Sequence, residues 1–187
     1  QNWFPKYLRE AHGLENQASG FITSLVLGGL AAGVLTGGVI ADRMLRTSTN
    51  LIRSRRILGA CAYLASAGCL ALAMQVEETL LLALLAALSC FCLQLTLPTW
   101  WSCAIEQSGR HVGTVFGMLN TIGVLGGLAS QGCVGRYLDW QEQRDIHGRE
   151  LWDPVFGVLI IALILAAIAW AFYPNRKPKS LREPGCP

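Results

Sequence analysis

The sequence predicts an all-α polytopic membrane protein. Of its 187 residues, 52% are apolar and only 14% are charged, whereas a soluble domain carries about a quarter of charged residues. Five stretches without Asp, Glu, Lys or Arg reach the ~20 residues that a helix needs to cross a bilayer. This composition excludes a soluble enzyme, a disordered tail and a secreted disulfide scaffold. The net charge of +3 is too weak and too scattered to indicate a nucleic-acid partner.

Residues 1–14 precede the first uncharged stretch and differ from it. Trp3, Phe4, Pro5 and Lys6 are typical of the interfacial end of a transmembrane helix. We therefore expect these residues to end a helix whose body lies before Gln1. The chain would then be a fragment, in which the end of one helix is followed by five complete spans.

The five uncharged stretches are expected to be helices, because inside lipid each backbone N–H and C=O must be paired locally. They are residues 19–41, 57–76, 79–105, 112–135 and 154–174. The short polar segments between them favour antiparallel neighbours. Pro98, within the third stretch, is expected to bend its helix and leave a carbonyl unpaired. Residues 175–187 would form a polar tail.

The positions of Lys and Arg predict the orientation. If the spans alternate, ten of the fifteen basic residues lie on one side. They are Arg43, Arg46, Arg53, Arg55, Arg56, Arg110, Arg176, Lys177, Lys179 and Arg182. The positive-inside rule then places the loop after the first span and the C-terminus in the cytoplasm. Trp140 and Trp152 would mark the outer interface.

The spans contain few groups for catalysis or metal binding. Six of the seven cysteines fall in apolar spans, where a thiol usually behaves as a small hydrophobe. No Cys-x-x-Cys pair, Asp dyad or Ser/His pair lies within them, and no span carries an Asp, Glu, Lys or Arg. We therefore predict no enzyme activity, no metal and no cofactor.

The first stretch combines small residues with a charged end. Gly29, Gly33 and Gly37 recur at every fourth position, which lets two helix backbones approach closely. Asp42, Arg43 and Arg46 follow this stretch, so a carboxylate beside arginines could pair across to another helix in one conformation only. A static packing face is the simpler interpretation of the glycines alone.

The segment Gly-x3-Asp-Arg-x2-Arg resembles the signature loop of the major facilitator superfamily. Here Leu45 and Thr47 stand where the fuller pattern has a glycine and a second basic residue. The resemblance implies a gating role for Asp42, Arg43 and Arg46, as part of a cytoplasmic latch.

A second segment resembles helices ten and eleven of the anion:cation symporter branch of that superfamily. It contains Pro98-x-Trp100, followed by Gly113-x3-Gly117-x2-Asn120-x2-Gly123. The resemblance makes the five spans helices eight to twelve and residues 1–14 the end of helix seven. It also implies that the substrate-binding residues are Thr99, Trp100 and Asn120, with weaker support for Gln94 and Trp101.

The residues themselves allow simpler roles. Asn120 could bridge two helices, and either tryptophan could belong to an aromatic belt at the membrane surface. Thr96 is expected to bond back to its own helix. Glu106 and Arg110 are expected to form a solvated loop pair. We expect no buried cation, so a preference for anions follows from the resemblance alone.

The resemblance implies a secondary transporter that works by alternating access between two six-helix bundles. The expected partners are a small sugar-acid-like anion, a coupling H⁺ or Na⁺, membrane lipid and a missing N-terminal half of the same chain. The expected location is the plasma membrane, by resemblance a bacterial inner membrane. The alternative is a standalone five-helix scaffold or subunit without transport activity, which explains the glycine faces but not the Asp-Arg motif.

Overall fold

A computed structural model describes residues 4–13, 15–144 and 148–173. The part of the chain that it describes is helical and contains no strand, which confirms the predicted all-α class. The helices are α1 (Phe4–His12), α2 (Asn16–Thr47), α3 (Leu51–Ala73), α4 (Thr79–Gln94), α5 (Leu97–Ser108), η1 (Gly109–His111, a short 3₁₀ turn), α6 (Val112–Glu142) and α7 (Arg149–Ala171).

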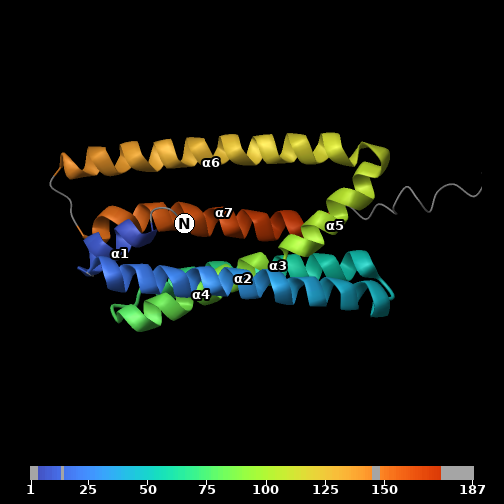
Figure 1. Cartoon of the computed structure of the whole chain (residues 1–187), viewed down its shortest axis with the longest axis horizontal. Coiled ribbons are helices and arrows are strands. Elements are labelled where there is room, and N and C mark those ends of the chain that lie inside the picture. Colours follow the sequence, from blue (N-terminus) through green and yellow to red (C-terminus); the bar gives the residue numbers. More distant parts are fainter. Residues whose placement is uncertain (1–3, 14, 145–147, 174–187) are drawn as a thin grey trace, which may run out of the picture.

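Within the described residues, four helical segments are long and apolar enough to cross a membrane. They are Asn16–Thr47, Leu51–Ala73, Thr79–Glu142 and Glu150–Ala171. The third has 64 residues and includes the turn η1, where α5 ends and α6 runs back along the molecule (Figure 1). It therefore contains two of the predicted spans, 79–105 and 112–135.

Helices α2, α3, α4 and α7 form the packed body of the molecule, whereas α6 lies apart from them (Figure 1). Helix α2 packs mainly on α4, and α3 packs on both α4 and α7. Helix α6 contacts chiefly α5 and α7, and among its described residues only Leu138 is buried. Throughout, the "α2–α3 end" denotes the end of the bundle where α2 ends and α3 begins, and the "α1 end" denotes the opposite one.

The glycine spacing of α2 produces a close crossing with α4. A Cβ atom added at Gly29 or Gly37 would lie 2.5 Å from the carbonyl oxygen of Ala87 or Leu95, respectively. At Gly33 it would overlap the carbonyl oxygen of Phe91. These glycines therefore form a packing face, as the simpler interpretation of their spacing predicts, and the helix that packs against it is α4.

Polar side chains also join α3 to α4 at depth in the bundle. The hydroxyl of Ser89 donates to the carbonyl oxygen of Ser66 at 2.9 Å, and the two hydroxyl oxygens lie 3.0 Å apart. Both serines are buried. Each hydroxyl therefore has a protein partner in a region where water cannot supply one.

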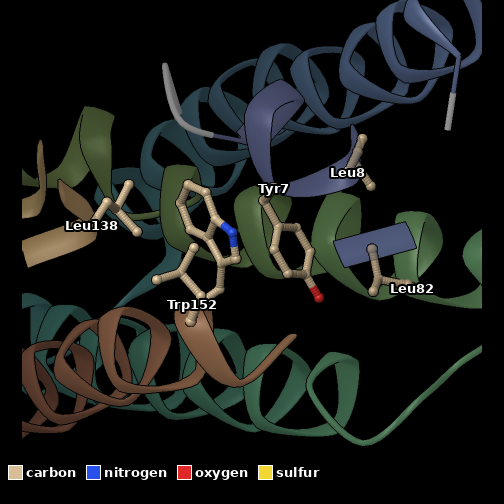
Figure 2. Close-up of a cluster of buried hydrophobic side chains, with 6 residues drawn as sticks. Tyr7, Leu8, Leu82, Leu138 and Trp152 are labelled. Atoms are coloured by element: carbon tan, nitrogen blue, oxygen red, sulfur yellow. The ribbon is translucent and has the colours of Figure 1, made fainter. Parts of the chain in front are cut away.

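A hydrophobic cluster closes the α1 end. Tyr7 and Leu8 of α1, Leu82 of α4, Leu138 of α6 and Trp152 of α7 are among its members (Figure 2). The rings of Tyr7 and Trp152 meet edge to face, with centroids 5.8 Å apart. Trp152 is only 1% exposed, so its ring packs against protein and not against lipid. A ring packed between α1 and α7 instead ties two distant segments together.

Two predicted boundaries need correction. The expected arginine loop is mostly helix, because α2 continues to Thr47 and α3 already begins at Leu51. Asn50 caps α3, since its side chain accepts a hydrogen bond from the backbone N–H of Arg53. The third span is not one helix over 79–105, but two helices that meet at Leu95 and Thr96. Residues 1–3 and the predicted tail 175–187 lie outside the described residues.

Candidate functional site

The break between α4 and α5 organises the candidate site. Pro98 occupies the first turn of α5, where a proline is tolerated because the N–H is unpaired in any case. Pro98 has no N–H to donate to the carbonyl of Gln94, four residues earlier, which favours a kink or break of the helix here. Thr96 donates its hydroxyl to the carbonyl oxygen of Leu93 at 3.0 Å, as expected for a back-bonded threonine.

Thr99 follows the break and lies on the buried face of α5. Its side chain is 2% exposed, on the same face as Cys103 one turn later. The Thr99 hydroxyl oxygen is buried and makes no hydrogen bond to the described residues. A buried hydroxyl without a partner is uncommon and costs free energy, and protein atoms enclose this one in the present conformation.

The two tryptophans after Thr99 lie together, half-buried, between α5 and α6. Their rings meet edge to face with centroids 5.0 Å apart. Trp101 also stacks on Phe116 of α6, with centroids 4.4 Å apart and an angle of 29° between the rings. Trp101 thus anchors α6 to α5, while Trp100 lines a crevice between α5, α6 and α7.

The other two predicted substrate-binding residues are placed separately. Asn120 is exposed on α6, one residue after Leu119, which shares the crevice with Trp100. Gln94 is half-buried at the end of α4, where its Cβ faces Gly33 of α2. The structure brings Trp100 and Trp101 together but leaves Asn120 and Gln94 on different helices.

The three predicted gating residues are exposed at the end of α2. They are Asp42, Arg43 and Arg46. Among the described residues, no side-chain hydrogen bond or ion pair of these three is formed, although Thr47 bonds to the Arg43 carbonyl. Their side chains are therefore accessible to another surface.

An ion pair that the sequence did not suggest lies nearby. Arg55 of α3 forms two hydrogen bonds to the carboxylate of Glu106 of α5, at 2.7 and 2.6 Å. Arg55 also donates to the hydroxyl of Ser102 at 2.8 Å, and Ser102 donates to Glu106 at 3.2 Å. The guanidinium is almost fully buried, with 6% of its side chain exposed. The expected solvated pair of Glu106 with Arg110 is therefore wrong.

Tyr173, just after α7, joins the same end. Arg56 donates to its carbonyl oxygen, and Gln107 donates to its hydroxyl. Helices α3, α5 and the end of α7 are thus connected by polar contacts at the α2–α3 end. The expectation that nothing cationic is buried is also wrong, because α3 begins before the uncharged stretch and carries Arg55 into the interior.

These features define a polytopic helical membrane protein with a tightly packed core and one interrupted span. The model of the Major Facilitator Superfamily matches residues 1–131. The chain belongs to this superfamily. No cluster of three or more His, Cys, Asp or Glu side chains able to hold a metal occurs among the described residues.

Curated relatives are named as transporters of anions. A probable sulfoacetate transporter of Cupriavidus necator is 34% identical over 128 residues, which are 66% of this chain and 29% of the relative. A D-galactonate transporter of Escherichia coli is 29% identical over 133 residues, 71% of this chain and 31% of the relative. A chloroplastic ascorbate transporter of Arabidopsis thaliana is 24% identical over 181 residues, 91% of this chain and 30% of the relative. The chain thus spans about a third of the length of these relatives.

Proposed function

We propose that this chain forms part of a secondary active transporter of small organic anions. The observation that carries this proposal is membership of the Major Facilitator Superfamily together with relatives named for sulfoacetate and D-galactonate. In such transporters two helical bundles rock about a site near the membrane midplane, and interrupted helices commonly contribute to that site. The break between α4 and α5 fits this role.

Thr99, Trp100 and Asn120 are proposed to contact the substrate, with Gln94 and Trp101 beside them. The unpartnered hydroxyl of Thr99 and the exposed amide of Asn120 supply hydrogen-bonding groups. Trp100 supplies a flat face for a sugar-like ring. Because the three side chains lie on two helices that meet only partly, substrate binding would draw α6 toward α5.

The anion's positive partner lies outside this chain in this proposal. Arg55 is the buried guanidinium among the described residues, and Glu106 already holds it through two hydrogen bonds. A carboxylate or sulfonate would have to displace Glu106 to reach it. The remaining two thirds of a relative's length would supply the cation that binds the anion and the group that couples H⁺ or Na⁺.

Uptake measurements test the assignment of Asn120. Replacing Asn120 by Ala should reduce uptake of the transported anion by about 10- to 150-fold, since losing one hydrogen bond to a charged group costs ~1.5–3 kcal/mol. Uptake would be measured in cells that express the protein, with radiolabelled sugar acids and sulfonates as candidate substrates. Ser130→Ala, an exposed position on the same helix, should leave uptake unchanged. Equal uptake by both variants at equal membrane levels would remove Asn120 from the site.

We also propose that Asp42, Arg43 and Arg46 form a latch at the cytoplasmic surface of the plasma membrane. Their exposed, unpaired side chains lie where a second bundle could meet them. Asp42→Asn should weaken the closed state and increase labelling of a cysteine introduced on the facing surface by a membrane-impermeant thiol reagent. Glu77→Asn, also exposed but at the α1 end, is the control. Unchanged labelling in Asp42→Asn would contradict the latch.

A further inference from the structure

A crevice of about 340 Å³ lies between α5, α6 and α7 near the α2–α3 end. Its walls are formed mainly by Trp100, Leu119 and Trp170, and Ala169 lies at its exposed margin. Helices α6 and α7 touch each other at few points, so the space between them is only partly filled by protein. This volume is at the lower end of the range for small-molecule sites, about 300–1,000 Å³.

The crevice is apolar inside and polar at one end. Gln107, Ser108 and Tyr173 line it where α5 and α7 end. Gln107 is bonded to the Tyr173 hydroxyl, and Ser108 donates to the carbonyl of Ala104. Tryptophan and tyrosine are typical of the boundary between acyl chains and headgroups. The walls therefore match a molecule with an apolar body and a polar end near the membrane surface.

Positive charge stands beside the polar end. Arg110 follows Ser108 by two residues in the turn η1, and its side chain is exposed. Among the described residues it has no hydrogen-bond or ion-pair partner. Arg56 reaches the same corner, where it donates to the carbonyl of Tyr173. No carboxylate lines the crevice, and Glu106, which precedes the lining residue Gln107, is already paired with Arg55.

We propose that this crevice binds an anionic phospholipid from the surrounding membrane. One acyl chain would lie between α6 and α7 against Leu119 and Trp170, and the phosphate headgroup would lie at Arg110. The bound lipid would fill the space between α6 and the packed body, where protein contacts are sparse. The crevice shares Trp100 with the proposed substrate contacts, and the test separates the two proposals because it measures lipid retention and not uptake.

Native mass spectrometry of the detergent-purified protein tests the proposal, with phosphatidylglycerol and phosphatidylcholine of equal chain length as probes. The wild type should retain one phosphatidylglycerol in preference to phosphatidylcholine. Ala169→Trp should abolish that adduct by filling the crevice. Arg110→Gln should reduce the preference for phosphatidylglycerol by about fivefold, the effect of one arginine near an anionic surface.

Matched controls separate this site from general lipid binding. Ala162→Trp lies two turns earlier on α7, at an exposed position outside the crevice, and should keep the adduct. Arg136→Gln removes an exposed charge of α6 toward the α1 end and should keep the preference. Equal retention in Ala169→Trp and Ala162→Trp would overturn the site. Loss of phosphatidylglycerol preference in Arg136→Gln as strong as in Arg110→Gln would overturn the assignment of the headgroup.

Discussion

Gly33→Ala is expected to destabilise the protein by about 1–3 kcal/mol, the usual cost of forcing an extra methyl group into a packed interface. The new Cβ would overlap the carbonyl oxygen of Phe91 and lie 3.0 Å from the Cβ of Gln94. Backbone cannot move aside as a flexible side chain can, so α2 and α4 would have to separate. Unfolding by sodium dodecyl sulfate, followed through tryptophan fluorescence, measures the loss.

Gly28→Ala is the matched control for this prediction. Gly28 lies on the same helix, and a Cβ added there meets nothing within 4 Å. Alanine is the better helix former by about 1 kcal/mol, so this variant should be as stable as the wild type or slightly more so. Equal destabilisation by both alanines would show that the close crossing of α2 and α4 contributes nothing specific.

Glu106→Gln is expected to cost about 2–4 kcal/mol, somewhat less than the full price of breaking a buried ion pair. It leaves the guanidinium of Arg55, with 6% of its side chain exposed, without a charged partner. The expected cost is below that of a fully buried pair because 31% of the Glu106 side chain is exposed. The same unfolding assay measures this effect.

A double-mutant cycle isolates the interaction between the two residues. Arg55→Met combined with Glu106→Gln should be more stable than the sum of the single changes predicts, with a coupling of about 1–3 kcal/mol. Arg53→Gln is the control for removal of one arginine from the start of α3, because that side chain is exposed. If the stability changes of the two single variants add up to that of the double variant, the two side chains do not stabilise each other, and water can replace their interaction.

Local patterns in the sequence predicted the helices and the close approach of α2, because both depend on residues near one another in the chain. The four-residue spacing of Gly29, Gly33 and Gly37 predicts that another helix approaches α2 closely, but it does not identify that helix as α4. The break at Pro98 was predictable for the same local reason. Helix ends were predicted less well, because charged residues such as Arg43 and Arg55 continue the helices beyond the uncharged stretches.

The polar contacts of the site depend on tertiary structure and could not be read from spacing. Arg55 and Glu106 are 51 residues apart, and Arg110, nearer in the sequence, was the more obvious partner for Glu106. Trp152 shows the same limit, since an indole near a helix end can face lipid or pack inward against Tyr7. For the predicted substrate residues, the sequence identified hydrogen-bonding groups within apolar spans, and their shared role remains the proposal that uptake assays test.

The packing of α3 against α7 constrains how the protein can be assembled during synthesis. A Cβ at Gly59 would overlap the ring of Trp170, and Arg56 meets Tyr173 across 117 residues of sequence. At the usual ribosomal rate, roughly 6–23 s separate the synthesis of these two partners. Throughout that interval the face of α3 that α7 later covers is open to lipid or to the insertion machinery. Helix α7 therefore completes the core only after every other described helix has been made.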